Sequence, residues 1–169
     1  MPEQNPHRRS GVIMLWIAWL LVLGGGWWIA DRWLHHQENP NQRPALNANG
    51  AVVLERNRQG HYVATGEING RKVTFLLDTG ATSVALSARL ARELDLQRGA
   101  EIRLDTANGS VVGFTTRLDS VRLGDIVVHG VSAVFSEGMM DDTVLLGMSF
   151  LKHLEFTQRE NQLILRALR

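Results

Sequence analysis

An uninterrupted apolar segment near the N-terminus constrains this chain more than any other feature. Residues Gly11 to Ala30 are twenty consecutive uncharged residues, GVIMLWIAWLLVLGGGWWIA. A helix of this length spans about 30 Å, which is the thickness of the hydrocarbon core of a bilayer. The segment contains Trp27 and Trp28 near its end, and Trp33 follows it. Tryptophans in such positions are typical of the aromatic belt of a membrane interface. We therefore expect residues 11–30 to form a single transmembrane helix.

A cleaved signal peptide and a buried core helix are the alternatives for this segment. A signal-peptide cleavage site requires small residues at the end of the apolar run. Ala30 meets this requirement, but Trp28 lies two positions earlier, where a bulky side chain is unsuitable. A core helix is disfavoured because twenty apolar residues match a bilayer better than a globular core. The segment is therefore interpreted as an uncleaved anchor.

The charges beside the apolar segment predict its orientation. Arg8 and Arg9 precede it, whereas Asp31 and Arg32 follow it and cancel. Because positive residues favour the cytoplasmic side, residues 1–10 are expected in the cytoplasm. The rest of the chain would lie across the inner (cytoplasmic) membrane, which in a bacterium is the periplasmic side. Residues 35–50 are polar and contain two prolines and four asparagines, so the segment 31–50 is expected to form a flexible linker.

The composition of residues 51–169 excludes several functions. This part of the chain contains fourteen Lys/Arg and fourteen Asp/Glu, so it offers no basic surface to neutralise phosphates, and no nucleic-acid partner is expected. The sequence has no cysteine, which excludes disulfides, thiolate catalysis and cysteine-ligated zinc. His61, His129 and His153 lack metal-ligand spacing. We expect neither a metal nor a cofactor.

Short apolar segments separated by turn signals dominate residues 51–169 and predict an all-β domain. Asn69-Gly70 and Asn108-Gly109 are strong hairpin signals, because a type I′ turn needs positive φ at both central positions. Ser87 is a suitable N-cap for a short helix over 87–94, and a second helix is expected over 148–154. The expected strands are 51–56, 61–68, 71–77, 101–105, 111–118, 120–123, 126–129, 131–135, 143–146 and 162–168.

Asp78 is the strongest candidate for chemistry. It follows the apolar residues Phe75, Leu76 and Leu77 and precedes Thr79-Gly80. A carboxylate at the end of an apolar strand is costly to bury unless it is paired or hydrogen-bonded. A simple turn at the end of a strand is the alternative interpretation of Asp-Thr-Gly, so the tripeptide alone does not identify a site.

The surrounding sequence resembles the retropepsin-like aspartic proteases. The segment Phe75-Leu-Leu-Asp-Thr-Gly-Ala-Thr82 resembles the active-site motif of that family, and Val144-Leu-Leu-Gly147 resembles its second signature. A glycine-containing hairpin over 104–116 stands where the family has its flap, which makes Ala107, Asn108 and Gly109 candidate flap residues. The resemblance covers nearly all of 51–169 and implies an all-β half-barrel. With the N-terminal anchor, the chain looks like a bacterial single-span subgroup.

The resemblance implies a homodimer that hydrolyses peptide bonds. Asp-Thr-Gly occurs once, so each copy would contribute one Asp78 to a pair that shares a proton and activates a water molecule. One carboxylate would act as the base and the protonated one as the acid, and activity would be bell-shaped in pH. The expected supporting residues are Thr79, Gly80 and Ala81 in the catalytic loop, and Leu145, Leu146 and Gly147 beside it.

Two departures from the family concern the dimer. Retroviral members carry an acidic residue shortly after the motif and an arginine just after the downstream glycine. This chain has Thr82 and Ser83 in the first region and Met148 in the second. We therefore expect the dimer to be held differently, with the segments 51–56 and 162–168 as candidate edge strands.

The expected substrate is an extended peptide or protein segment near the membrane. Two other functions remain to be distinguished from proteolysis. A catalytically silent module of the same fold would bind extended peptides by strand addition. A membrane-anchored, lipocalin-like carrier would need longer alternating strands than this sequence contains.

Overall fold

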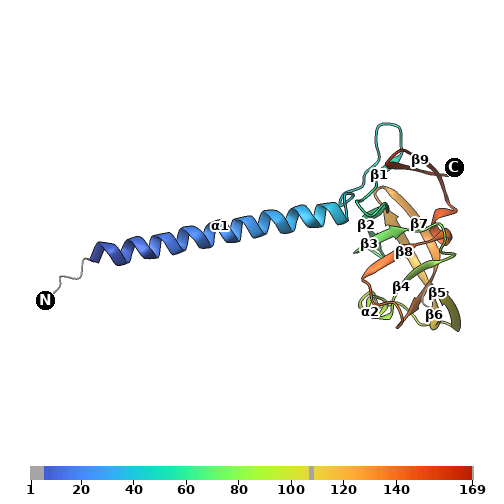
Figure 1. Ribbon diagram of the computed structural model, residues 1–169. Coiled ribbons are helices and arrows are strands. Elements are labelled where there is room, and N and C mark those ends of the chain that lie inside the picture. Colours follow the sequence, from blue (N-terminus) through green and yellow to red (C-terminus); the bar gives the residue numbers. More distant parts are fainter. Residues whose placement is uncertain (1–5, 107–108, 169) are drawn as a thin grey trace. The chain divides into compact units, whose positions relative to one another are not determined.

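The structure is a computed structural model that describes residues 6–106 and 109–168. The chain divides into two compact units, residues 1–37 and residues 38–169. In its described part the first unit is helical and belongs to helix α1 (Pro6–Glu38) (Figure 1). Large apolar side chains along α1 are exposed, including Trp16, Leu20 and Trp27. Among the described residues, no helix is long and apolar enough to cross a membrane.

Residues 39–50 belong to the second unit and are held to the rest of it by hydrogen bonds. The side chain of Asn41 is buried; its amide group donates to the carbonyls of Glu55 and Val63, both at 2.8 Å. Its side-chain oxygen accepts the Glu55 N–H at 2.7 Å. The backbone N–H of Leu46 donates to the carboxylate of Asp125. This part of the expected linker thus lies against the domain. The Asn41 side chain satisfies backbone groups of Glu55 and Val63 that need hydrogen-bond partners.

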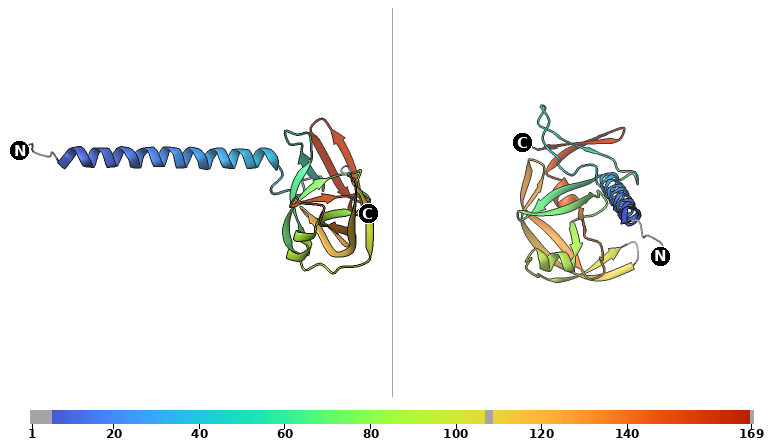
Figure 2. Two further views of the ribbon diagram at one scale, coloured as in Figure 1. Left: turned by 60° about the horizontal axis from the view of Figure 1, so that its bottom comes forward. Right: turned by 90° about the vertical axis from the view of Figure 1, so that its left-hand side faces the viewer.

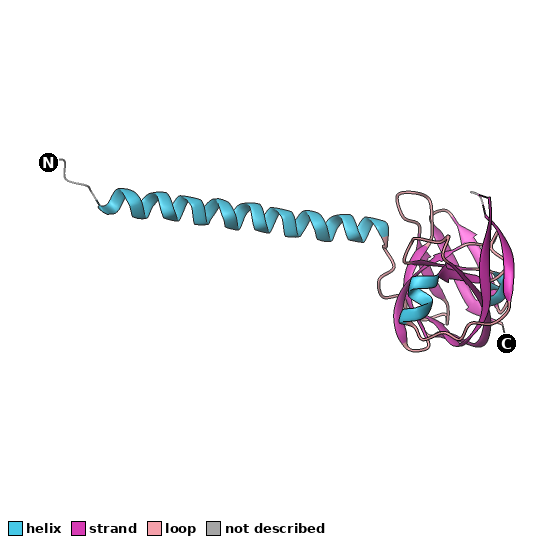
Figure 3. Cartoon of the chain, turned by 90° about the horizontal axis from the view of Figure 1, so that it is seen from below, coloured by secondary structure: helices cyan, strands magenta, loops and turns pink. Residues whose placement is uncertain are grey.

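Strands dominate the second unit, as Figure 3 shows, and the all-β prediction is confirmed. Within the described residues the larger sheet has the strand order β2-β3-β8-β4-β7-β6-β5. An additional pairing of β2 with β6 brings the sheet back on itself. Its strands are β2 (Val63–Ile68), β3 (Arg71–Leu77), β4 (Val84–Ser87), β5 (Glu101–Thr106), β6 (Gly109–Leu123), β7 (Ile126–Ser136) and β8 (Thr143–Leu146).

A smaller sheet joins the two ends of this unit. It has the order β1-β10-β9, formed by β1 (Val52–Glu55), β9 (Leu154–Arg159) and β10 (Gln162–Ala167). Figure 2 shows the β9–β10 hairpin in red. The expectation that 51–56 and 162–168 both form edge strands is wrong for the second segment. Strand β10 pairs on both sides, with β1 and with β9, so the edges of this sheet are β1 and β9.

Two short helices follow strand ends in the larger sheet. Helix α2 (Ala88–Glu93) begins after Ser87, whose hydroxyl accepts the N–H of Leu90 at 3.2 Å, so the predicted N-cap is confirmed. Helix α3 (Met148–Leu151) begins directly after Gly147. It ends three residues earlier than expected, because Leu154 starts strand β9.

Fully buried side chains from both β3 and β8 lie in the core. Phe75 of β3 and Val144 and Leu146 of β8 are 0% exposed. They belong to one core cluster with Leu86 of β4 and Phe150 of α3. Each such burial stabilises the fold by roughly 1.5–3 kcal/mol. Packing on this scale fixes the ends of β3 and β8, where the predicted site residues begin.

Candidate active site

The two predicted motifs meet at the ends of neighbouring parallel strands. Strands β3 and β8 pair in parallel, with Leu77 opposite Leu146. Because parallel strands end at the same edge of a sheet, Asp78 and Gly147 both emerge there. The backbone N–H of Asp78 donates to the carbonyl oxygen of Leu146 at 3.3 Å. The structure thus brings together the residues that the sequence placed in one site.

The carboxylate of Asp78 is held by its own loop. The Gly80 N–H donates to Oδ1 of Asp78 at 2.8 Å, and the Ala81 N–H donates to the Asp78 carbonyl at 3.2 Å. A methyl group on Gly80 would lie only 3.1 Å from that Oδ1. Asp78 is half-buried, whereas Thr79 and Gly80 are exposed. One carboxylate oxygen is therefore fixed by the backbone at an accessible position.

Gly147 permits the loop that carries Asp78 to lie directly on the start of helix α3. A methyl group at Gly147 would lie 2.6 Å from the carbonyl oxygen of Ala81, and it would also collide with the carbonyl of Ser83. The N–H groups of Met148 and Ser149 donate to the carbonyls of Ala81 and Thr82 at 2.8 and 3.0 Å. These bonds satisfy N–H groups that a helix start leaves free.

Ser149 connects the strands next to this loop through its hydroxyl group. The sequence analysis did not identify this residue. Its hydroxyl accepts the N–H of Val84 at 2.9 Å and donates to the carbonyl of Ser132 at 2.7 Å. The hydroxyl thus joins β4, β7 and the start of α3. The only sequence signal was a serine two residues after Gly147.

A cleft of about 370 Å³ opens beside the candidate carboxylate. Its walls come from the end of β3, helix α3 and the smaller sheet, and they are mainly apolar. The lining residues are Tyr62, Leu77, Asp78, Thr79, Leu151, Phe156, Gln158, Leu163 and Leu165. The carbonyl of Tyr62 accepts the Leu77 N–H at 3.0 Å, which attaches one wall of the cleft to β3. Sequence reasoning did not place the β9 and β10 residues here.

The predicted flap hairpin is present in its described part. Strands β5 and β6 pair antiparallel, with Thr106 opposite Gly109. Gly109 has a φ of 112°, a value that glycine adopts without strain. Ala107 and Asn108 lie outside the described residues. The hydroxyl of Ser136 donates to the carbonyl of Val112 at 2.7 Å, which ties the hairpin to the end of β7.

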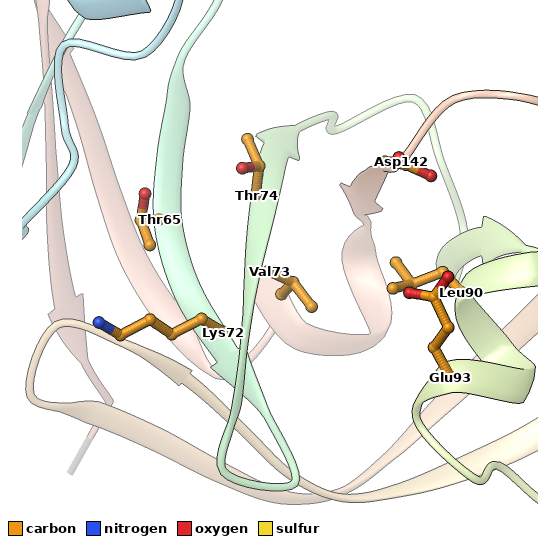
Figure 4. A pocket seen from close by; sticks show the side chains of 7 residues that line it. All are labelled: Thr65, Lys72, Val73, Thr74, Leu90, Glu93 and Asp142. Atoms are coloured by element: carbon orange, nitrogen blue, oxygen red, sulfur yellow. The ribbon is translucent and has the colours of Figure 1, made fainter.

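A second hollow, of about 270 Å³, lies between β3 and α2 and is shown in Figure 4. Thr65, Lys72, Val73, Thr74, Leu90, Glu93 and Asp142 line it. None of the predicted site residues is among them. Two of its carboxylates, Glu93 and Asp142, pair with Arg89. The catalytic candidates therefore belong to the cleft at Asp78 and not to this hollow.

Comparisons with known proteins agree with this geometry. The family model described as gag-polyprotein putative aspartyl protease matches residues 64–153. An uncharacterized protein in the cobV 5' region of Sinorhizobium sp is 34% identical over 120 residues, covering 68% of this chain and 51% of that protein. Uncharacterized protein RP867 of Rickettsia prowazekii (strain Madrid E) is 29% identical over 119 residues, covering 69% and 51%. The chain thus spans about half the length of these curated relatives.

A solved structure shares the fold. The crystal structure of a retropepsin-like aspartic protease from Rickettsia conorii matches with a TM-score of 0.56 and 28% identity. The match covers 69% of this chain and 89% of that one. The family model spans more than half of this chain and includes both Asp78 and Gly147. The chain therefore belongs to the gag-polyprotein aspartyl protease family and has a retropepsin-like fold.

Proposed function

We propose that this protein is an aspartic endopeptidase in which Asp78 is the catalytic residue. The observation that carries the proposal is the carboxylate of Asp78, fixed by the Gly80 N–H at the edge of a mainly apolar cleft. A carboxylate that has one oxygen fixed by a hydrogen bond and is accessible to water can activate a water molecule as a general base. The apolar cleft walls suit side chains of an extended peptide.

The proposed site requires two copies of the chain. Water activation and protonation of the leaving amine need one ionised and one protonated carboxyl group. Each chain supplies one Asp-Thr-Gly motif, so the second carboxyl group comes from Asp78 of another copy. Two carboxyl groups about 3 Å apart do not both ionise. The pair therefore holds one proton and combines both roles.

The supporting residues have separate roles in this proposal. Thr79 is exposed beside Asp78 and would hydrogen-bond across the dimer beneath the carboxylates. Gly80 and Ala81 shape the loop that holds Asp78. Leu145 and Leu146 align β8, and Gly147 admits the loop. The hairpin over 101–123, which includes residues 107–109, would cover the bound peptide.

The second copy has a free strand edge available in the smaller sheet. Within the described residues β9 pairs on one side only, with β10, whereas Val52 of β1 also forms a bridge with Leu46; an edge such as β9 can accept a further strand. Phe156 of β9 lines the cleft beside Asp78 and is 42% exposed. We therefore propose β9, with Phe156, as part of the contact that completes the site.

The test is cleavage of a peptide library by the wild-type chain and by Asp78→Asn. Asp95→Asn is the matched control, because it makes the same change at an exposed carboxylate that pairs with Arg71 and does not line the cleft. The proposal predicts cleavage by the wild type and the control, and none by Asp78→Asn at equal folding. Equal cleavage by all three would contradict it. Peptide binding without cleavage by any of them would favour the silent peptide-binding module.

We also propose that residues 11–30 hold the protein at the inner membrane, with the N-terminus in the cytoplasm and the protease domain outside it. The uncharged run, the preceding Arg8 and Arg9 and the exposed apolar side chains of α1 support this placement, because such surfaces seek an apolar environment. Membrane fractionation with alkaline extraction and protease protection tests it. Recovery of the chain in the aqueous fraction would overturn the proposal. Protease digestion of the domain from the cytoplasmic side of the membrane would also overturn it.

A further inference from the structure

Arg56 is held against Tyr62, one of the residues that line the cleft. It directly follows β1, and its guanidinium carbon lies 5.3 Å from the centre of the Tyr62 ring. Its Nη2 donates to the Tyr62 hydroxyl at 3.3 Å. Stacking and hydrogen bonding to the same aromatic side chain fix both the position and the plane of the guanidinium.

The hydrogen-bonding capacity of Arg56 is largely unused. Its Nε is buried and has no hydrogen-bond partner among the described residues. Other arginines of the β domain pair with carboxylates, including Arg71 with Asp95 and Arg92 with Glu137. A guanidinium offers five N–H donors and no acceptor, and buried donors are nearly always satisfied in folded proteins. Arg56 is therefore a preorganised cation without a carboxylate partner in the described part of the chain.

Tyr62 connects this cation to the candidate active site. The same tyrosine lines the cleft together with Asp78 and Thr79. Its backbone carbonyl accepts the N–H of Leu77, the residue before Asp78. A shift of Arg56 and Tyr62 would thus disturb the wall of the cleft. Arg56 does not itself line the cleft, so a ligand would meet the guanidinium only where it extends past Tyr62.

We propose that Arg56 binds a carboxylate of the peptide that occupies the cleft, so that the protease selects substrates with Asp or Glu near the cleaved bond. This inference rests on the proposed function. A planar, fixed guanidinium suits a carboxylate because two N–H groups can contact both oxygens. The paired Asp78 carboxyl groups carry negative charge that would repel an acidic substrate. Arg56 supplies the opposite charge that offsets this repulsion.

A carboxylate of a second copy of the chain is the other possible source of the same chemistry. In that case Arg56 would stabilise the dimer and leave substrate choice unchanged. The two sources differ in what a change of Arg56 affects: the preference among peptides in the first case, and the dimer dissociation constant in the second.

The experiment compares peptide pairs that differ only by Glu against Gln at one position at a time. Binding is measured on the full-length Asp78→Asn chain, and cleavage is measured on the wild type. The inference predicts at one position a preference for Glu on the order of tenfold, as expected for one accessible charge-assisted hydrogen bond. Arg56→Gln should remove the preference, while Arg56→Lys, which keeps the charge without the planar fork, should retain part of it. Arg71→Gln is the control and should retain all of it.

The outcomes separate the two proposals. Cleavage of Glu and Gln peptides at equal rates at every position would overturn the role of Arg56 and leave the protease assignment intact. Loss of dimer in Arg56→Gln, with the Glu preference unchanged, would also overturn it and assign the carboxylate to the second copy. A Glu preference in binding without cleavage of any peptide would support the role of Arg56 and overturn the proteolytic function. Circular dichroism of each variant verifies folding, and Arg56→Lys provides the test if Arg56→Gln does not fold.

Discussion

The backbone N–H of Asp78 donates to the carbonyl oxygen of Leu146 at 3.3 Å. This bond continues the parallel pairing of β3 with β8 one residue beyond the strand. It holds the loop that carries Asp78 against a strand that lies far away in the sequence. Substitutions in the loop after β3 and at the start of α3 should therefore change the unfolding free energy and the cleavage rate to different extents.

Gly147→Ala should destabilise the whole domain. The added methyl group would lie 2.6 Å from the carbonyl oxygen of Ala81, and backbone atoms on both sides leave little room to adjust. Overpacking of this kind costs about 1–3 kcal/mol or more. Urea unfolding measures the change. A stability equal to that of the wild type would show that the loop is not packed on Gly147 as described.

Gly80→Ala should reduce activity more than stability. Its methyl group would lie 3.1 Å from Oδ1 of Asp78, so the carboxylate would have to move by a few tenths of an ångström. Displacements approaching 1 Å at a catalytic group cost up to about a hundredfold in rate. We expect a clear loss of cleavage rate with unfolding free energy within about 1 kcal/mol of the wild type. A variant that cleaves at the wild-type rate would argue against the held carboxylate.

Ser149→Ala should loosen the support of the catalytic loop. The hydroxyl bonds to Val84 N–H and Ser132 C=O would be lost. The Val84 bond is partly buried, so its N–H would be left unpaired at a cost of about 1–3 kcal/mol, whereas the Ser132 carbonyl is exposed to water. Denaturant unfolding and hydrogen exchange at Val84 measure the loss. Ser83→Ala is the comparison, because the Ser83 hydroxyl makes no hydrogen bond with the described residues. Equal effects of the two changes would be inconsistent with the bridging role of Ser149.

Arg89→Ala should have little effect on stability. Arg89 pairs with Glu93 and with Asp142, but its side chain is 52% exposed. Exposed ion pairs contribute about 0–1 kcal/mol, and salt weakens them further. Thermal unfolding at low and high salt measures the effect. A loss well above 1 kcal/mol would mean that these pairs hold the segment before β8 in place.

The sequence predicted most of the strands that lead into the site. β3 occupies residues 71–77 as expected, because an Asn-Gly turn signal and an apolar run mark both of its ends. β4 was missed because it has four residues and three of them are buried, so no alternating pattern is visible. β9 was missed because only Leu154 is buried in it. Its pairing with β10 depends on a hairpin, and the exposed residues of β9 show no alternating pattern that would predict one.

The catalytic motif was visible in the sequence, whereas the cleft around it was not. Asp78 and Gly147 carry local signals, a polar residue after an apolar strand and a glycine before a helix. Phe156 and Leu165 line the cleft from the smaller sheet, and Tyr62 lines it from the residue before β2. The stacking of Arg56 on Tyr62 likewise arises from the course of the chain between β1 and β2. Such contacts depend on tertiary packing and leave no periodic pattern.

Subunit mixing tests most directly whether two copies of Asp78 form one active site. Wild-type chain is mixed with increasing amounts of full-length Asp78→Asn under conditions that allow subunits to exchange, and cleavage per wild-type subunit is measured. If both carboxyl groups are needed, mixed dimers are inactive, and activity per wild-type subunit falls in proportion to the wild-type fraction. Asp95→Asn in place of Asp78→Asn should cause no such fall. Constant activity per wild-type subunit at every mixing ratio would contradict the paired site.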